Sequence, residues 1–318
     1  MRARRMTATR KTILHGGEFQ MNKVKILTDS CADLSGEILE KYGIDYARMS
    51  TVLDGKTTPA SLTWEYYTPH ELYETIRNGQ RVTTTQVPVD EFQRIFELYL
   101  GEGYDIVYIG CSLKLSGSVN TARVVAGKLA ETFPNQSVFC IDAKNSSAGE
   151  GLLAIYAATL AAEGKSAKEV ADAVSEKRGN VLQYVAVQSL DCLRKAGRVK
   201  GSAAFFGNLF GVRPIIISDA DGNNAPIKKV KGRVNSLKEC VNLLKENAFD
   251  DGQPIYFVHA DCQAEEVESI KAMIKEAFPK SEIIVGYIGP IVGACVGPDS
   301  VGLFAFGKEV TYRVEANA

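Results

Sequence analysis

The sequence predicts an α/β protein of two α/β domains, with a parallel sheet in the first and a mixed sheet in the second. In the first half, strand-like apolar runs alternate with helical patterns, which is typical of βαβ units. In the second half, two strand-like runs joined through Asp221-Gly222 predict an antiparallel pair. The polar break AAEGKSAKE near Gly164 predicts a boundary between domains 21–163 and 164–318.

The elements expected in the first half follow one another in βα order. KVKILT (23–28), DYARMSTVL (45–53), DIVYIG (105–110) and SVFCID (137–142) are strand-like apolar runs. Apolar residues at helical spacing predict the helices between and after them. These helices are expected after residue 33, in PHELYETIRNG (69–79) and VPVDEFQRIFELYLGEG (87–103), after residue 117, and in SSAGEGLLAIYAATLAAEG (146–164).

The second half predicts fewer βα units and more strand pairing. RPIIISDADGNNAPIKKVKG (213–232) supplies the antiparallel pair. The other expected elements are a helix over 166–179, a strand over 181–190, helices over 233–248 and 263–278, and strands over 254–260, 282–289 and 301–307.

Composition and charge exclude several classes of protein. The 318 residues are 45% hydrophobic and 24% charged, which predicts a soluble globular protein with a sizeable core. The formal net charge of −1 argues against nucleic-acid binding. No apolar run approaches the roughly 18 residues of a membrane span, so integral membrane association is not expected.

The first twenty residues, MRARRMTATRKTILHGGEFQ, are expected to form a disordered basic leader or to reflect a start codon assigned upstream of Met21. They hold five Arg or Lys and one Glu and lack the apolar stretch of a signal peptide. The seven cysteines are widely spaced without a C-x-x-C pair, and the three histidines lack ligand spacing. A reducing cytoplasm is therefore expected, with no disulfide framework, no metal site and no cofactor.

Polar, glycine-bearing stretches directly follow several expected strands. Ligands of open α/β sheets bind at the carboxyl ends of strands, so we expect these stretches to converge on one cleft. They predict one ligand head group, a carboxylate, held at the mouth of an apolar pocket. The stretches are TDSCADL (28–34), VTTTQVPVDEF (82–92), CSLKLSGSV (111–119), DAKNSSAGEGLL (142–153), RKAGRVKGS (194–202) and GPIVGACVGPDSVGL (289–303).

Each stretch also has a plain structural interpretation. Asp33 or Ser35 can cap the next helix, and Ser116 is expected to be a helix N-cap with Gly117 providing close packing. A helix N-terminus also binds anions, although neither G-x-G-x-x-G nor a Walker A loop is present. The glycines of 289–303 are expected in a tight connection or close to a ligand.

These stretches, in this order, resemble the DegV family, whose members include the fatty-acid-binding subunits of bacterial fatty acid kinase. The resemblance runs from about Val24 to Val310. TDSCADL resembles an Asp-Ser-x-Ala-Asp signature, TTQVPVDEF a Thr-Ser-Gln-x-x-x-Glu-Glu-Phe motif, SLKLSGSVNTA a Ser-x-x-Leu-Ser-Gly-Thr segment, LRKAGRVKG a Gly-Gly-Arg loop, and IGPIVGACVGP a Gly-Pro-x-x-Gly-x-x-x-Gly-Pro segment.

The resemblance implies a two-domain α/β protein that holds a long-chain fatty acid in a buried tunnel between and within its domains. Family members bind the carboxylate with a Thr and a Ser that match Thr84 and Ser116. We expect Thr85, Ser112 and Ser30 to add hydroxyls to this site. In kinase-linked members, a separate ATP-using subunit phosphorylates the bound carboxylate, so a kinase partner is expected.

Further residues are assigned through the same resemblance. Arg198 matches a basic residue that assists phosphoryl transfer, and Ile291 and Cys295 of the last motif are expected to line the tunnel. Some members carry His in that last motif, and Ala196 stands where Gly is common. The apolar segment FFGNLFGVRPIII is expected to supply further tunnel walls through Phe205, Phe206, Leu209 and Phe210.

Two other functions are compatible with the residues alone. Ser116 or Cys111 could be the nucleophile of an acyl esterase or thioesterase, but only His259 lies near a strand end and no G-x-S-x-G elbow exists. Helix N-termini could instead hold a sugar phosphate or nucleotide phosphate.

Overall fold

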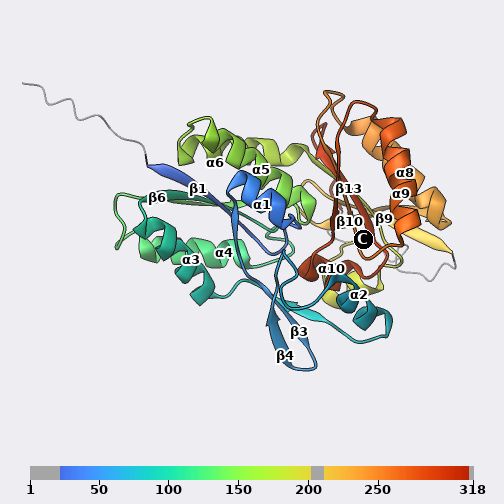
Figure 1. Cartoon of the computed structure of the whole chain (residues 1–318), viewed down its shortest axis with the longest axis horizontal. Helices are drawn as coiled ribbons and strands as arrows, with labels where there is room; N and C mark the ends of the chain where they lie inside the picture. Colours follow the sequence, from blue (N-terminus) through green and yellow to red (C-terminus); the bar gives the residue numbers. More distant parts are fainter. Residues whose placement is uncertain (1–21, 202–210, 315–318) are drawn as a thin grey trace, which may run out of the picture.

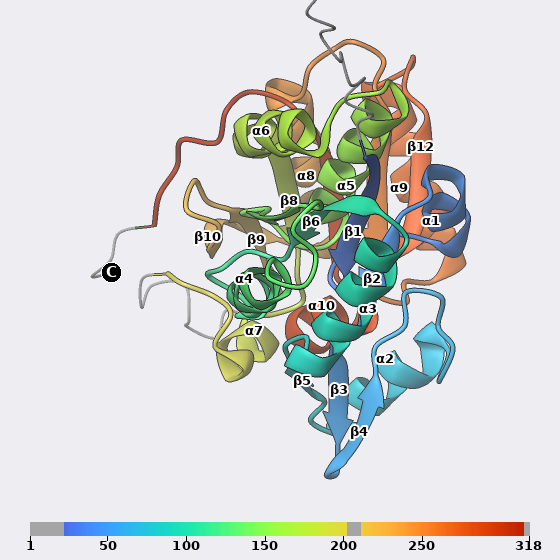
Figure 2. The same cartoon turned by 90° about the vertical axis from the view of Figure 1, so that its left-hand side faces the viewer.

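The computed structural model describes residues 22–201 and 211–314, and two large sheets organise them (Figures 1 and 2). A four-stranded sheet has the order β2-β1-β6-β7, and every pairing in it is parallel. A six-stranded sheet has the order β10-β9-β8-β13-β11-β12 and mixes antiparallel pairs with the parallel pair β11–β12. The predicted α/β class, with a parallel first sheet and a mixed second sheet, is confirmed.

Helices cover both faces of the first sheet. Figure 1 shows α5 and α6 on one side of it and α3 and α4 on the other. Because both faces are covered, its central strands are buried at consecutive residues, 26–29 of β1 and 106–110 of β6, rather than at alternate ones. Its elements are β1 (Lys23–Asp29), α1 (Gly36–Tyr42), β2 (Asp45–Ala47), α3 (Val89–Gly101), β6 (Tyr104–Gly110), α4 (Ser118–Leu129), β7 (Val138–Asp142), α5 (Ala148–Ala162) and α6 (Ala167–Lys177).

Helix α5 lies between the two sheets. It packs against β1 and β6 of the first sheet and against β8, β11 and β13 of the second. A helix with apolar residues on all sides is typically buried on all sides, and α5 is buried at every residue from Ala148 to Leu153. The two sheets therefore share a core along this helix.

The second sheet has its outer face covered by α8 and α9 (Figure 1). The predicted antiparallel pair is present as β9 and β10, which join through the turn at Asp221-Gly222. The elements are η1 (Arg178–Asn180), β8 (Val181–Ala186), α7 (Asp191–Ala196), β9 (Val212–Ser218), β10 (Asn224–Lys231), α8 (Arg233–Asn247), β11 (Ile255–His259), α9 (Ala264–Ala277), β12 (Ile283–Tyr287) and β13 (Val301–Phe306).

The expected strand over 45–53 is wrong because the segment divides between two sheets. After β2, the Met49 N–H donates to the Ser30 hydroxyl (3.0 Å) instead of continuing the parallel ladder. The chain then enters a small antiparallel sheet of order β4-β3-β5, which the sequence did not predict. Its strands are β3 (Ser50–Leu53), β4 (Lys56–Pro59) and β5 (Thr83–Thr85).

The glycine-rich segment 289–303 contains a helix rather than only a tight connection. Helix α10 (Pro290–Val296) begins with proline at its first position, where no backbone N–H is needed. Gly293 lets α10 approach α2 (Pro69–Arg77), because a Cβ there would clash with the Tyr73 hydroxyl. The Tyr73 hydroxyl donates to the Ile288 carbonyl at 2.6 Å and fixes this contact.

The predicted boundary near Gly164 falls between α5 and α6. Both helices contact strands of the first sheet, and the chain enters the second sheet only at Val181. The division at 163 therefore stays a prediction. Among the described residues, no helix combines the length and apolarity needed to cross a bilayer.

Candidate functional site

A cavity lies between the carboxyl ends of β1 and β6 and the inner face of the second sheet. It has a volume of about 860 Å³, counted with its open mouth. Cys31 and Cys111 line it just beyond the ends of β1 and β6, between which the strand order of the first sheet changes direction. This is where open α/β sheets bind ligands.

The opposite wall of the cavity comes from the second sheet and is mostly apolar. Val185, Ile216, Val258 and Phe304 each lie on a different strand of that sheet and all line the cavity. Helix α10 adds Ile291, so this predicted lining residue is in the cavity wall. Such a wall favours the apolar part of a ligand through burial of its surface.

The mouth of the cavity is marked by residues that it shares with an outer cleft. The cleft has a volume of about 1180 Å³, counted with its open side. Thr84, Arg198 and Cys295 line both spaces, and Arg81 and Lys195 also line the outer cleft. A ligand that enters from the cleft would pass the positive charges first and then reach the hydroxyls of the cavity.

Ser116 lies at the cavity with its hydroxyl held by the turn that precedes α4. Its Oγ accepts a hydrogen bond from Ser118 N (3.3 Å) and lies 3.0 Å from Ser118 Oγ, which in turn accepts from Val87 N (3.1 Å). This network fixes the rotamer of Ser116 and leaves its oxygen next to the cavity. The predicted N-cap role is wrong, since Gly117 holds the N-cap position and the Ser116 hydroxyl bonds within a two-residue turn.

Thr84 and Thr85 reach the cavity from β5. Thr84 pairs with Thr51 of β3 and is less exposed than Thr83 and Thr85 on either side. Cys295 of α10 lines the same cavity. Burial raises the pKa of this thiol to about 11, although the Arg198 charge and the Thr84 side chain act in the opposite direction. Cys295 is therefore a neutral thiol near pH 7.

Arg198 is anchored at the mouth by two backbone carbonyls. Its Nε donates to Leu115 O and its Nη1 donates to Ala196 O, both at 2.7 Å. The Leu115 contact ties the basic loop after α7 to the segment that carries Ser116. One end of the cavity thus combines hydroxyls from β5 and from the turn before α4 with a fixed positive charge.

Two of the predicted hydroxyls do not line this cavity. The Ser30 hydroxyl donates to Ala60 O (3.0 Å) and accepts from Met49 N, which joins β1 to the small sheet. The Ser112 hydroxyl donates to Gly222 O (2.8 Å), which joins the first sheet to the β9–β10 turn. Both side chains are fully buried and hold the structure together, because their hydroxyls are used by backbone groups.

The predicted tunnel walls Phe205, Phe206, Leu209 and Phe210 lie outside the described residues.

The cavity lacks the groups that a hydrolase needs. Among its described lining residues there is no histidine and no carboxylate that could take a proton from Ser116. His259 is buried in β11, where its Nδ1 accepts from Cys262 N at 3.3 Å and its ring packs on Tyr287. Burial lowers the pKa of His259, which keeps the ring neutral there.

Asp33 connects the loop after β1 to the start of α10 beside the cavity. Its carboxylate accepts from Ser147 Oγ (2.5 Å) and Gly289 N (2.8 Å). The predicted capping role falls to Ser35, whose Oγ accepts from Ile38 N at the start of α1. Burial raises the pKa of Asp33 to about 7, although both hydrogen bonds act to lower it.

Asp33→Asn is expected to alter how stability depends on pH. In the wild type, the folded state keeps the Asp33 proton up to about pH 7, while the ordinary pKa is 3.8. The stability from the protonated form is complete below the ordinary pKa and is lost as pH rises toward 7, at up to about 1.4 kcal/mol per pH unit. In denaturant unfolding measured from pH 4 to 7, the free energy of unfolding of the variant should rise relative to that of the wild type as the pH increases.

The matched control is Asp54→Asn, an exposed turn residue with the same left-handed backbone, φ 48° against 49° for Asp33. A stability difference between the Asp33 variant and wild type that stays constant over this pH range would show that Asp33 is already ionised in the folded protein.

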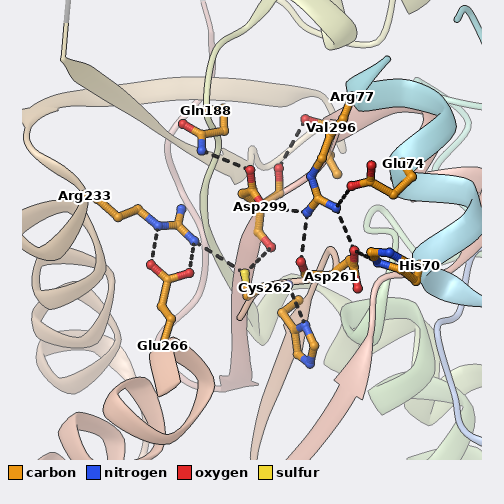
Figure 3. Close-up of polar contacts among 12 residues, drawn as sticks. His70, Glu74, Arg77, Gln188, Arg233, Asp261, Cys262, Glu266, Val296 and Asp299 are labelled. Atoms are coloured by element: carbon orange, nitrogen blue, oxygen red, sulfur yellow. Dashed lines mark hydrogen bonds and ion pairs between the residues drawn. The ribbon is translucent and has the colours of Figure 1, made fainter. Parts of the chain in front are cut away.

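An ion-pair network fastens α2 over the loops of the second sheet (Figure 3). Arg77 Nη1 donates to Asp261 Oδ2 and Nη2 donates to Asp299 Oδ1, both at 2.7 Å. Asp261 follows β11 and Asp299 precedes β13, and Gln188 also donates to Asp299 (3.3 Å). Because α2 also contacts α10, this network holds a wall of the cavity in place.

Comparison with known proteins identifies the family. A family model described as "Uncharacterised protein, DegV family" matches residues 23–308. The chain belongs to the DegV family. A DegV domain-containing protein of Clostridium perfringens is 32% identical over 288 residues, which cover 90% of this chain and 98% of that protein. A second from Caldanaerobacter subterraneus is 27% identical over 285 residues, 89% of this chain and 99% of that protein.

Solved DegV structures have the same fold. A DegV lipid-binding protein from Thermotoga maritima is 28% identical with a TM-score of 0.78, covering 91% of this chain and all of that one. DegV from Bacillus subtilis, described as a fatty acid binding protein, is 26% identical with a TM-score of 0.77 and the same coverage.

The DegV motifs located the mouth of the cavity but not its inner wall. Gln183 is one lining residue that the motifs missed: its side chain is 4% exposed, and Oε1 has no hydrogen-bond partner among the described residues. Its Nε2 donates to Asn224 Oδ1 at 3.2 Å. A glutamine inside the apolar run VLQYVAV was the sequence signal that could have indicated it.

Proposed function

We propose that this protein binds a long-chain fatty acid in the cavity, with the acyl tail along the second sheet and the carboxylate at Thr84, Thr85 and Ser116. The observation that carries the proposal is a cavity whose apolar wall ends at a cluster of hydroxyls beside an anchored arginine. The lipid- and fatty-acid-binding descriptions of DegV relatives from Thermotoga maritima and Bacillus subtilis support the same ligand class.

The energetics suit a ligand with an acidic head and a long apolar tail. A tail of roughly 14 methylenes at about 0.8 kcal/mol each could contribute on the order of 11 kcal/mol. Association costs of about 4–15 kcal/mol offset much of this. Hydrogen bonds to a charged carboxylate add about 1.5–3 kcal/mol each. The tail therefore supplies most of the affinity, and the hydroxyls fix which end of the ligand faces the mouth.

The outer cleft suits presentation of the carboxylate to a partner kinase that forms an acyl phosphate. It is open to solvent and carries Arg81, Lys195 and Arg198 next to the proposed head-group site. Positive charge at this position favours an incoming phosphoryl group. Cys295 at the same mouth is a neutral thiol, so Arg198 is the residue we assign to phosphate contact.

Mass spectrometry tests the ligand. Native spectra of the purified protein should show a bound mass near that of a fatty acid, and organic extracts should contain one fatty acid per chain. A protein that is empty, and stays empty after incubation with a fatty-acid mixture, would contradict the proposal. For the kinase step, loaded protein with a fatty acid kinase subunit and ATP should yield acyl phosphate, trapped as hydroxamate, and Arg198→Gln should slow its formation.

A further inference from the structure

Two cysteines and a glutamate meet in the interior beside the cavity. The Cys31 and Cys111 sulfurs and a Glu150 carboxylate oxygen all lie within 4.8 Å of one another. The three residues are 3%, 2% and 0% exposed. They come from the ends of β1 and β6 and from the first turn of α5, so the fold joins positions that lie far apart in the sequence.

One carboxylate fixes the main chain of both cysteines. Asp29 Oδ1 accepts from Cys31 N (2.9 Å), and Asp29 Oδ2 accepts from Cys111 N (3.1 Å) and from the Tyr108 hydroxyl (2.7 Å). The two sulfurs are thus held close by a rigid shell of hydrogen bonds rather than by chance contact. Such outer-shell bonds are typical of built ligand sites.

The two carboxylate oxygens of Glu150 differ in their hydrogen bonding. Its Oε1 accepts from the Thr28 hydroxyl at 2.7 Å. Its Oε2 is buried and has no hydrogen-bond partner among the described residues. A buried carboxylate oxygen without a partner is costly, and this one belongs to the same side chain that approaches both sulfurs.

We propose that Cys31, Cys111 and Glu150 bind a thiophilic divalent cation of the zinc type. Two thiolates and one carboxylate are ordinary zinc ligands, and three protein ligands leave one position of a tetrahedral ion for another donor. Cys31 and Cys111 both line the cavity, so the further donor would come from a molecule there. The Met49 thioether, 3.7 Å from the Cys31 sulfur, also lines the cavity.

Zinc was not expected from the sequence because Cys31 and Cys111 form no C-x-x-C motif. Cys31 and Cys111 lie close together because they follow β1 and β6, which pair side by side in the first sheet. On binding, the two thiols and Glu150 lose any protons they carry to solvent, and no redox step is involved. The carboxylate ligand distinguishes this site from a Cu(I) site, which takes soft sulfur donors.

Cobalt titration of the reduced, full-length protein under anaerobic conditions tests the site. One equivalent of Co²⁺ should give sulfur-to-metal charge-transfer absorption and the intense visible bands of a tetrahedral ion, and Zn²⁺ should abolish both. Cys31→Ser and Cys111→Ser should each reduce the charge-transfer band, the double variant should lose it, and Glu150→Gln should weaken binding at least tenfold. Cys140→Ser, a partly buried cysteine of β7 outside the cluster, is the matched control and should titrate like wild type.

X-ray absorption on the zinc-loaded wild type needs no variant. It should show two sulfurs at about 2.3 Å and oxygen at about 2.0–2.2 Å. A shell without sulfur, or Co²⁺ binding that survives loss of both cysteines, would overturn the proposal as adventitious surface binding. A metal affinity that is unchanged in Glu150→Gln, together with a preference for Cu(I), would overturn the zinc assignment. Because delipidated protein is used, failure here would be separate from failure of the proposed fatty-acid binding.

Discussion

Replacing Thr84 and Ser116 together by alanine is expected to weaken fatty-acid binding at least tenfold. Both residues line the cavity, and Ser116 is held in position by Ser118. Each hydrogen bond to a carboxylate is worth about 1.5–3 kcal/mol, and a tenfold change in affinity needs about 1.4 kcal/mol. Displacement of a fluorescent fatty acid from delipidated protein measures the change.

Two controls separate loss of the head-group site from general damage. Thr57→Ala removes an exposed hydroxyl from β4 of the same small sheet as Thr84 and should leave the affinity unchanged. A fatty alcohol of equal chain length should lose less affinity in the double variant than the acid does, since it carries no charge. Equal affinity of wild type and double variant for the acid would place the carboxylate elsewhere.

Replacing Arg77 by alanine is expected to lower the free energy of unfolding by about 2–3 kcal/mol. Removing one partner of a buried ion pair leaves the other charge uncompensated, at a cost of about 3–5 kcal/mol. The Arg77 side chain is 24% exposed, so we expect a value below that range. Asp261, whose side chain is 16% exposed, and Asp299 would both lose Arg77 as their ion-pair partner. Denaturant unfolding at pH 7 measures the difference.

Variants with matched chemistry sharpen this test. Arg77→Lys keeps the charge but cannot reach both carboxylates with one planar fork, so an intermediate loss is expected. Arg94→Ala removes a more exposed helix arginine, which pairs with Glu91 on the same helix, and should cost under about 1 kcal/mol. If Arg77→Ala and Arg94→Ala were equally mild, the Arg77 network would not hold α2 in place.

The sequence predicted most strands of the two large sheets and the polar segments that reach the cavity, because both depend on local signals. Thr84 and Ser116 stand in short polar segments directly beside apolar elements, and the chain order of those segments matched a family pattern. The split of 45–53 was not predictable in this way. It depends on the hydroxyl of Ser30, which directly follows β1 and takes the Met49 N–H out of the ladder.

The inner wall of the cavity could not be predicted from the sequence for a different reason. Val185, Ile216 and Val258 are ordinary strand residues, and only the packing of the second sheet against α5 decides that their side chains line a cavity. Ser30 and Ser112 show the opposite error. They look like ligand hydroxyls in their motifs, yet backbone carbonyls of distant segments take their hydrogen bonds.

The position of α5 between the sheets also matters while the chain is being made. The helix ends at Ala162, but the central strand of the sheet that covers its second side, β13, ends only at Phe306. At 5–20 residues per second, roughly 140 residues of further synthesis take about 7–30 seconds. During that time the side of α5 that faces the second sheet has no part of the chain to cover it. Ribosome-associated chaperones would find their binding surface there, and the second half of the chain would release them by folding.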